Sequence, residues 1–421
     1  MTKKLDLYLN EELCGIVTDN GGTLAFKYDD AYEVGNTPLS LSMPLEVKEH
    51  PNRVIKPFLS GLLPDNANAM AALSKRLGVS ANSPFAILEK IGIDVAGAIK
   101  IYPHGEKPSR AIKDSAMKYI SDEEIENELL NKVTEYTNGL TSGFSGGRIS
   151  LAGAQPKIAL HRTAGGRWVQ PNEKYISTHI IKPVTGVLGH LDIVEHLTLE
   201  AARAGGLNVC DSEIVEFGKI QSFVATRYDR ELDQSSGDIK RVHQEDFCQA
   251  LGVAPENKYQ NAHGGPGVGA ISSLLSRLPN LEDRRNVARA FFKALVFNIY
   301  AKCPDAHAKN YSLLLTSDRV ELAPLYDLAT GIPYQGMNKS AMAINDKYLF
   351  TQISMKDLVR EAKRLKIMQE EAENIVDTCR TQILFNFKKA STKIVKDVEN
   401  VEPLVRIMAQ LETVLTPPII E

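Results

Sequence analysis

The sequence predicts an α+β chain with a β-rich N-terminal part and a mostly helical C-terminal part. Over residues 5–28 apolar positions alternate with polar ones, and Asp19-Asn20-Gly21-Gly22 reads as the turn of a hairpin. Beyond Asp229 the apolar residues mostly recur three and four positions apart, which is the period of a helix. These two patterns place strands early in the chain and helices late.

The other elements follow from local patterns. A helical period from about Ile55 to Leu77 is interrupted at Pro64, and Ala86–Lys100 combines a short helix with a strand that ends near Pro103. Ser121, followed by acidic residues, marks the start of a capped helix. Further helices are expected at Leu191–Ala204, Arg284–Tyr300, Met355–Leu365 and Gln369–Phe387.

Composition excludes several classes of protein. The chain has 421 residues and is 43% hydrophobic, enough for two or three domains with cores. Its five cysteines are scattered without a C-x-x-C pair, which disfavours a disulfide framework or a structural zinc site. Asp6 precedes any apolar run and no apolar stretch is long enough to span a membrane, so we expect a cytoplasmic protein. With a net charge of −3, any DNA association has to be local or through a partner.

One short segment carries the main chemical signal. Asp305 and Asn310 are five residues apart in Asp305-Ala306-His307-Ala308-Lys309-Asn310, and Asp327 follows seventeen residues later. Protein kinases use this spacing for a catalytic base, a metal-binding amide and a metal-binding carboxylate. A hydroxyl nucleophile needs a proton acceptor, and Mg²⁺ prefers hard oxygen ligands. The spacing indicates phosphoryl transfer, although an Asp and an Asn in a loop also cap helices or form Asx turns.

Two glycine-containing loops are candidates for a phosphate-covering loop. Glycines in Ser145–Lys157 allow backbone amides to approach phosphate oxygens, and residues 157–160 read as a strand after it. This loop lacks the G-K-[ST] ending of a Walker A motif, and a turn between two strands is the other interpretation. Gly264–Gly269 is richer in glycine but has no lysine nearby, and we interpret it as a flexible surface loop.

Three further side chains are candidates for the same chemistry. Lys182 ends the apolar run His179–Ile181, where ATP phosphates would supply the negative partner that a buried lysine needs. The alternative is a lysine at a strand end whose amine reaches water. Lys309 is placed to neutralise charge on the transferred phosphoryl group. His307 is expected to support the loop by packing rather than to act as the base.

The order of these segments resembles one known family. In chain order they are Ser145–Lys157, Thr178–Pro183, Thr226–Arg230, His243–Gly252, Asp305–Asn310 and Pro324–Asp327. Together they resemble the HipA serine/threonine kinases, the toxin components of bacterial toxin–antitoxin pairs. The resemblance runs from the N-terminal strands, through Gly61–Asn66, to at least Asp327. Cys303-Pro304 departs from the family pattern, and the proline stiffens the approach to Asp305.

The resemblance implies a two-lobed, protein-kinase-like fold. It implies a HipA N-terminal domain over 1–105, a nucleotide-binding lobe over 106–229 and a helical catalytic lobe over 230–421, and the polar stretch 103–110 marks the first boundary. Asp305 and Lys309 are then catalytic, and Asn310 and Asp327 hold Mg²⁺. The residues implied to contact ATP are Ser150, Ala152, Gly153, Ala154, Gln155, Lys157, Lys182, Thr226, Arg227, Tyr228, His307, Asn310, Tyr326 and Asp327.

The resemblance also implies regulation and partners. Ser150 is the implied site of autophosphorylation, and an aminoacyl-tRNA synthetase, with glutamyl-tRNA synthetase the leading candidate, is the implied substrate, so that translation stops and dormancy follows. A helix-turn-helix antitoxin like HipB would dock the chain on operator DNA. The basic residues Lys388, Lys389, Lys393 and Lys396 either touch DNA in such a complex or form a solvated helix face.

Two alternative functions stay open. The chain could act with its antitoxin as a kinase-fold co-repressor with little catalysis. It could also be a small-molecule phosphotransferase, since those enzymes share the D-x-x-x-x-N loop.

Overall fold

The computed structural model describes residues 2–108, 117–138, 152–153, 155–184, 188–234 and 237–416. The chain divides into two compact units. The first comprises Met1–Pro183, Glu216–Glu256 and Leu314–Asp318, and the second comprises Val184–Val215, Asn257–Leu313 and Arg319–Glu421. Both units contain helices and strands, which confirms the predicted α+β class. The division into three domains at residues 105 and 229 stays a prediction.

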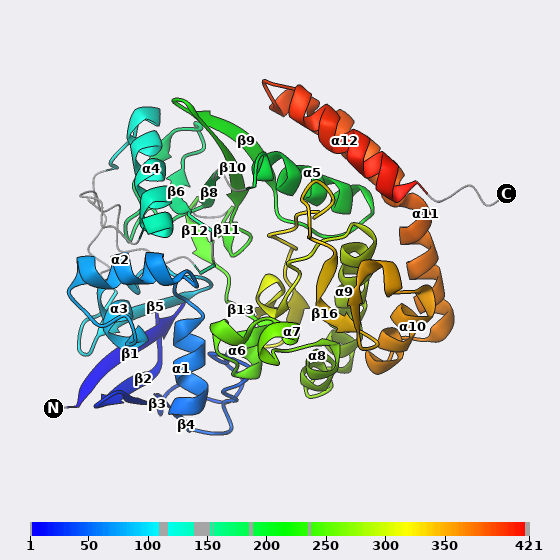
Figure 1. The fold of residues 1–421 in the computed structure, drawn as a ribbon. Coiled ribbons are helices and arrows are strands. Elements are labelled where there is room, and N and C mark those ends of the chain that lie inside the picture. Colours follow the sequence, from blue (N-terminus) through cyan, green and yellow to red (C-terminus); the bar gives the residue numbers. More distant parts are fainter. Residues whose placement is uncertain are drawn as a thin grey trace. The chain divides into compact units, whose positions relative to one another are not determined.

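The first unit begins with an antiparallel sheet of five strands in the order β4-β3-β2-β1-β5 (Figure 1). Its strands are β1 (Lys3–Leu9), β2 (Glu12–Asn20), β3 (Thr23–Tyr28), β4 (Glu49–Pro51) and β5 (Ile99–Pro103). The predicted hairpin was wrong in one respect, because β2 lies between the two alternating segments and pairs with both. The chain turns into β2 at Asn10 and Glu11, both with positive φ, so no glycine marks that turn in the sequence.

Three helices accompany this sheet: α1 (Asn52–Ser60), α2 (Ala67–Leu77) and α3 (Pro84–Ile91). Ile55, Phe58 and Leu59 of α1 belong to the same buried core as strand residues such as Leu7 and Phe26. The side chain of Asn66 accepts a hydrogen bond from the Ala69 amide at 2.9 Å and starts α2. The predicted interruption near Pro64 and the strand ending at Pro103 are therefore confirmed.

A second sheet has the strand order β7-β6-β8-β10-β9. Its strands are β6 (Ile158–Arg162), β7 (Trp168–Val169), β8 (His179–Pro183), β9 (Ser212–Phe217) and β10 (Ile220–Thr226). The central strand β8 pairs antiparallel with both β6 and β10. The other elements of the first unit are α4 (Asp122–Asn138), β11 (Arg230–Leu232), β12 (Ile239–Arg241), β13 (Gln244–Asp246) and α6 (Phe247–Leu251). Ser121 and Glu124 cap α4 reciprocally, as predicted.

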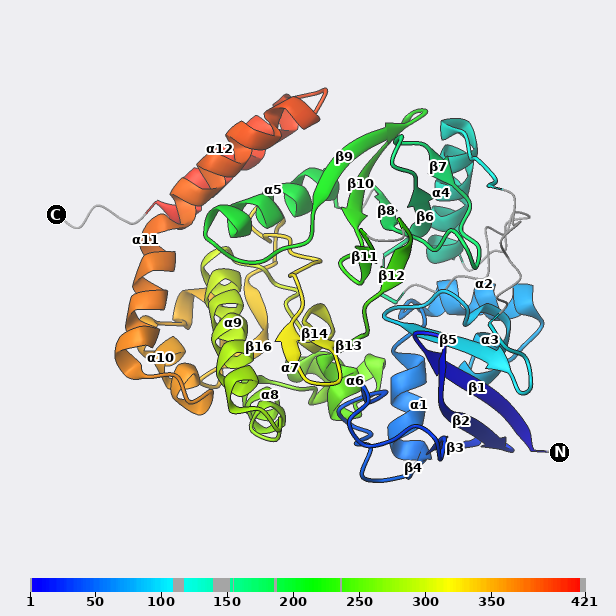
Figure 2. The same cartoon turned by 180° about the vertical axis from the view of Figure 1, so that it is seen from behind.

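Helices dominate the second unit. They are α5 (Leu191–Ala204), α7 (Gln260–His263), α8 (Val268–Leu275), α9 (Leu281–Tyr300), α10 (Met355–Arg364), α11 (Gln369–Ile394) and α12 (Glu402–Leu415). The four helices predicted from apolar spacing, α5, α9, α10 and α11, are all present, and α11 continues seven residues beyond the predicted end at Phe387. In Figure 2, α11 lies alongside α10 and α12.

Helices predominate in the later part of the chain, as predicted, and one other expectation for it needs correction. Short strands follow Asp229 as well as helices, and those not yet named are β14 (Ser312–Leu315), β15 (Val320–Leu322), β16 (Lys339–Ile344) and β17 (Lys347–Leu349). The segment Gly264–Gly269 is no flexible surface loop, because it forms the tight connection between α7 and α8 and Pro266, Gly267 and Val268 are buried.

Candidate active site

In the second unit, the end of α9 leads directly into the segment that carries Asp305. Cys303 donates its amide hydrogen to the Asn298 carbonyl at 2.8 Å, and Lys302 turns the chain with φ = 57°. The Lys302 carbonyl accepts a hydrogen bond from the Gly331 amide at 2.8 Å, and the Ala301 carbonyl accepts one from the Thr330 hydroxyl at 2.6 Å. The chain just before Asp305 is thus held by three hydrogen bonds, one of them from the Thr330 side chain, in addition to the proline at 304.

The loop from Asp305 to Asn310 is held by its own hydrogen bonds. The Asp305 carbonyl accepts from the His307 amide and from the Asn310 side-chain amide, each at 2.8 Å. The Asn310 main-chain amide donates to the His307 carbonyl at 2.9 Å, and residues 308–310 form the short helix η3 (Ala308–Asn310). Because the nitrogen of the Asn310 amide is engaged, its carbonyl oxygen is the end left for a metal ion.

A tyrosine links this loop to the segment that carries the second acid. The Tyr326 hydroxyl donates to the Lys309 carbonyl at 2.7 Å and also contacts the Ser312 hydroxyl at 2.7 Å. A phenol has one hydrogen, so Ser312 is the donor in the second contact. Lys309 directly precedes Asn310, and Tyr326 directly precedes Asp327. The hydrogen bond therefore ties together the residues next to the two predicted metal ligands.

Asp327 has an unusual backbone conformation. Its φ is 56°, in the left-handed region that residues other than glycine seldom adopt. Asparagine and aspartate tolerate this conformation best, and such conformations cluster at ligand-binding sites. The structure thus holds the Asp327 carboxylate on a backbone turn that most other residues would strain.

The remaining predicted residues of this loop differ in exposure. The Asp305 side chain is 58% exposed, whereas His307 is 3% exposed and Lys309 is 6% exposed. The His307 ring packs edge-on against Tyr259, with ring centroids 4.8 Å apart, and its Nε2 lies 3.8 Å from Asp305 Oδ1. The loop therefore offers an accessible carboxylate beside a buried imidazole.

Lys182 lies in the first unit, within β8. It is 9% exposed and pairs across the sheet with Phe223 of β10, and its Nζ lies 5.2 Å from the centroid of the Phe223 ring. Lys182 is the last residue but one of β8, and its burial argues against an amine that reaches water. Burial of an ammonium group calls for nearby negative charge.

The described part of the predicted phosphate-covering loop lies near the start of β6. The Lys157 ammonium donates to the Ala152 carbonyl at 2.9 Å, and the Asp65 amide donates to the Gly153 carbonyl at 3.2 Å. Gly153 has φ = 110°, a conformation that residues with a side chain rarely adopt, so the backbone here favours glycine. Gln155 is partly buried. Ser150 and Ala154 lie outside the described residues.

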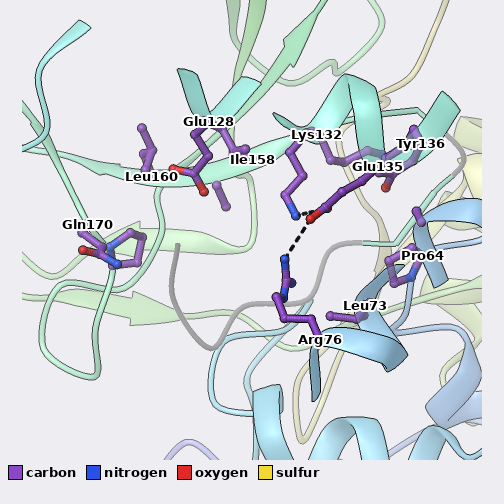
Figure 3. Close-up of a pocket in the computed structure, with 14 residues that line it drawn as sticks. Pro64, Leu73, Arg76, Glu128, Lys132, Glu135, Tyr136, Ile158, Leu160 and Gln170 are labelled. Atoms are coloured by element: carbon purple, nitrogen blue, oxygen red, sulfur yellow. Dashed lines mark hydrogen bonds and ion pairs between the residues drawn. The ribbon is translucent and has the colours of Figure 1, made fainter. Parts of the chain in front are cut away.

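A pocket of about 70 Å³ in the first unit is lined by Lys157 and by residues of α2, α4 and β6 (Figure 3). Its wall contains an ion chain in which Glu135 accepts from Arg76 at 3.0 Å and from Lys132 at 2.6 Å. Glu128 also faces it, and burial raises the pKa of Glu128. Of the predicted site residues that the structure describes, only Lys157 lines this pocket.

Two residues of the Thr226–Tyr228 segment, Arg227 and Tyr228, form hydrogen bonds with other parts of the first unit. The Arg227 main-chain amide donates to the Thr178 carbonyl at 2.8 Å, and the Tyr228 hydroxyl donates to Gln244. The Arg227 side chain is 4% exposed and donates to both carboxylate oxygens of Asp229, at 2.9 and 2.7 Å. Thr226 is exposed at the end of β10. The segment thus anchors the end of β10 through its side chains.

Arg227 belongs to a buried network of five charged residues, which we call the Asp94 network. Its members are Asp94, Arg227, Asp229, Arg230 and Arg241. Asp94 lies 2.8 Å from Arg230 and 3.1 Å from Arg241, and it accepts a hydrogen bond from the Ser177 amide at 3.0 Å. Burial alone would raise the pKa of Asp94, but the charges of the three arginines hold it below its usual range.

Sequence reasoning missed two parts of this arrangement. Asp94 was not singled out, although a lone acid in the apolar context of residues 91–99 could have drawn attention to a buried ion pair. Tyr259 donates a hydrogen bond to Asp305 Oδ1, and no pattern in the sequence connects two residues that are 46 positions apart.

Two of the four basic residues at positions 388–396 form ion pairs. Lys388 lies 3.0 Å from Glu412, and Lys393 lies 2.5 Å from Glu200. These ion pairs favour the interpretation of a solvated helix face on α11. Among the described residues, no helix combines the length and the apolar character needed to cross a membrane.

Comparison with known proteins places these features in a family. Residues 149–386 match the family model of the HipA-like C-terminal domain, and residues 5–102 match that of the HipA N-terminal domain. A putative kinase, Y4mE, from Sinorhizobium fredii is 32% identical over 89% of this chain and 89% of its own length. The serine/threonine-protein kinase toxin HipA of Shewanella oneidensis is 32% identical over 82% of this chain and 80% of its own length.

A solved structure extends the similarity to three dimensions. HipA of Shewanella oneidensis MR-1, determined with HipB and its operator DNA, superposes with a TM-score of 0.82 at 26% identity. It covers 98% of this chain and 95% of its own. The predicted kinase-like α+β fold is confirmed by this match.

Proposed function

This chain belongs to the HipA family of serine/threonine-protein kinases, and from that premise we propose that it transfers the γ-phosphoryl group of ATP to a serine or threonine hydroxyl of a protein. The observation that carries the proposal is the 2.7 Å hydrogen bond from Tyr326 to the Lys309 carbonyl. It joins the segment with the base and the amide to the segment with the second acid, which are the parts that a kinase uses together.

The base is Asp305. Its exposed carboxylate accepts the proton of the acceptor hydroxyl, while the loop holds its main chain through two hydrogen bonds to the Asp305 carbonyl. Lys309 is assigned to the charge that develops on the transferred group. His307 is assigned to loop support, which agrees with its burial against Tyr259.

The donor set fits a magnesium ion. Asn310 offers a carbonyl oxygen, because its nitrogen donates to the Asp305 carbonyl, and Asp327 offers a carboxylate on a left-handed turn. When bound, Mg²⁺ would neutralise charge on the phosphate oxygens. These two residues would hold it, and Tyr326 keeps their segments together.

In the first unit we assign the ATP phosphates to Lys182 and to the loop that ends at Lys157. The buried Lys182 ammonium and the glycine at 153 are the features that support this assignment. Thr226, Arg227 and Tyr228 are assigned to the adenine end through their main chain. Since the Arg227 amide already binds Thr178, adenine would have to use the other main-chain groups of this segment.

Incubation of the purified protein with γ-labelled ATP, Mg²⁺ and a cell extract tests the proposal. Label in a protein band supports a protein kinase. Label in small metabolites alone points to a small-molecule phosphotransferase, and no transferred label points to a protein without catalysis. A parallel reaction with the Asp305→Ala variant, which should transfer far less label than the wild type, shows whether the signal comes from this active site.

Substrate and regulation are proposed from the family alone. We assign an aminoacyl-tRNA synthetase, with glutamyl-tRNA synthetase first, as the protein substrate, and inhibition of translation as the outcome. Ser150 is assigned as the autophosphorylation site, where a phosphate would add charge near an anionic nucleotide. Purified synthetases offered one at a time with labelled ATP test the substrate, and mass spectrometry after incubation with Mg²⁺ and ATP tests Ser150.

A helix-turn-helix antitoxin is the proposed partner. Support comes from the similar HipA of Shewanella oneidensis, which was solved with HipB and operator DNA. Contact with DNA would then run through the antitoxin, since Lys388 and Lys393 are engaged in ion pairs. Gel-shift assays with operator DNA, with and without the antitoxin, test this and also the alternative that the chain is chiefly a co-repressor.

A further inference from the structure

Tyr259 is in direct contact with the proposed base. Its hydroxyl donates a hydrogen bond to Oδ1 of Asp305, and its ring packs edge-on against His307 with an interplanar angle of 85°. His307 is 3% exposed and so provides a fixed surface, whereas the Asp305 side chain is 58% exposed. Tyr259 therefore connects the exposed Asp305 carboxylate to the buried His307 ring.

The glycine-rich connection between α7 and α8 holds the segment that carries Tyr259. The Gly265 amide donates to the Tyr259 carbonyl at 3.1 Å, and a Cβ at Gly265 would lie 2.0 Å from the Asn257 carbonyl oxygen. A Cβ at Gly267 would lie 2.3 Å from the side-chain oxygen of Gln260, which accepts a hydrogen bond from the Ala343 amide at 2.8 Å. Both glycines are thus required by close approach.

We propose that Tyr259 is a positioning residue for Asp305, an inference that rests on the proposed role of Asp305 as the base. A base must keep hydrogen-bond geometry with the hydroxyl that it deprotonates, and an exposed aspartate alone samples several rotamers. A donor fixed on one carboxylate oxygen orients the whole carboxylate. Because hydrogen bonds to charged groups are the stronger kind, the Tyr259 hydroxyl is well suited to this task.

The Tyr259→Phe variant isolates the hydroxyl, because it keeps the ring that packs on His307. We expect the turnover number for protein phosphorylation to fall about tenfold to a hundredfold, since misplacement of a catalytic group by about 1 Å can cost about a hundredfold in rate. The KM for ATP should not change. The control is Tyr348→Phe, a partly buried tyrosine of β17, which should leave both constants as in the wild type.

A double-mutant cycle then distinguishes positioning from a general structural role. In the Asp305→Ala background, Tyr259→Phe should cause no further loss of the residual single-turnover rate, because the group that it orients is gone. An equal loss in both backgrounds would mean that Tyr259 only supports the fold.

The remaining outcomes separate this inference from the proposed function. Wild-type or faster turnover of Tyr259→Phe, together with an inactive Asp305→Ala, would overturn the positioning role and leave the base assignment intact. Faster turnover would mean that the tyrosine competes with the acceptor hydroxyl for Asp305. Full activity of Asp305→Ala would overturn the base assignment itself, and the positioning role with it.

Discussion

At Asp327 the backbone conformation and the proposed metal ligation favour the same residue types. A left-handed residue favours glycine, asparagine or aspartate, and a magnesium ligand needs a side-chain oxygen, so aspartate and asparagine satisfy both. Only aspartate also brings a negative charge. Substitution by asparagine therefore changes the charge while it leaves the turn unstrained.

The Asp327→Asn variant should keep the fold and lose activity. Removal of a charged metal ligand weakens the stabilisation of transition-state charge by about 3 kcal/mol or more, roughly a hundredfold in turnover. Kinase assays over a range of Mg²⁺ concentrations, with circular dichroism to check folding, measure this. Asp346→Asn is the matched control, because Asp346 also has a positive φ, at 63°, but lies in the exposed turn between β16 and β17. A folded Asp327→Asn protein with near-wild-type activity would contradict the metal assignment.

The Asp305→Ala variant should separate binding from transfer. ATP is assigned to other groups, so its dissociation constant should stay within a few-fold of the wild type while phosphoryl transfer fails. Fluorescent nucleotide titration and a label-transfer assay on the same preparation give both quantities. If nucleotide affinity disappeared together with activity, Asp305 would have to be a structural or metal-binding residue.

At the scale of elements, a buried glutamate joins a loop near the N-terminus to the start of α6. Glu245 of β13 accepts hydrogen bonds from the Ser40 hydroxyl and, at 2.8 Å, from the Leu41 amide. It is 1% exposed, and burial raises the pKa of Glu245 to about 8. In the unfolded chain its pKa is about 4.3.

This contact should make the first unit less stable as the pH rises. Between about pH 5 and pH 8 the folded chain holds a proton on Glu245 that the unfolded chain has lost, so stability falls as the pH rises, by on the order of 1 kcal/mol per pH unit. Below pH 4 this contribution is fully present, and above pH 8 it is gone. Thermal unfolding of Glu245→Gln, compared with wild type at pH 6 and pH 8, should show a smaller decrease with pH. Glu256→Gln, an exposed neighbour, should retain the wild-type decrease.

The elements were predictable where one local pattern decides them. Leu191–Ala204 was predicted to the residue, because its apolar positions recur at the helical period and it is buried against α11. The strand β2 was missed because its turn uses Asn10 and Glu11 rather than glycine. The glycines of 264–269 were misinterpreted, since the sequence cannot distinguish a flexible glycine from one required by the close approach of Asn257.

The candidate site also contains residues that the sequence could suggest and residues that it could not. Asp305, Asn310 and Asp327 could be proposed from the sequence because kinases keep such residues at fixed spacing within one stretch of chain. Tyr259 could not be found, since its contact depends on how α7 folds back on the loop. The sequence suggested that Arg227 contacts ATP, but it could not show that the Arg227 side chain is in a buried ion pair. Its partner Asp94 lies 133 positions earlier in the sequence.

At the scale of the molecule, the Asp94 network connects early and late segments of the first unit. Asp94 contacts Ser177, Arg230 and Arg241, and the Gly97 amide donates to Asp229 at 2.7 Å. Burial acts to raise the pKa of Asp229, but Arg227 and Arg230 lower it to about 2. All five side chains are charged, and each buried charge depends on the opposite charges of the others.

The Asp94→Ala variant should destabilise the first unit severely. It leaves three buried arginines with one carboxylate, and removal of one partner from a buried ion pair costs about 3–5 kcal/mol. Thermal and urea unfolding should show the loss, and Asp30→Ala, whose side chain is 88% exposed, should change stability little. An unchanged unfolding midpoint for Asp94→Ala would mean that water or rearranged side chains replace the carboxylate.

The Asp94 network limits which segments of the chain can be exchanged by recombination. One carboxylate lies within residues 5–102 and its cationic partners lie within residues 149–386, so the two segments that family models recognise separately share one set of buried charges. Recombination that exchanges either segment between relatives would have to preserve this charge pattern, or the hybrid would bury an unmatched arginine. A hybrid is therefore expected to fold well only when both of its segments come from chains that share these buried charges.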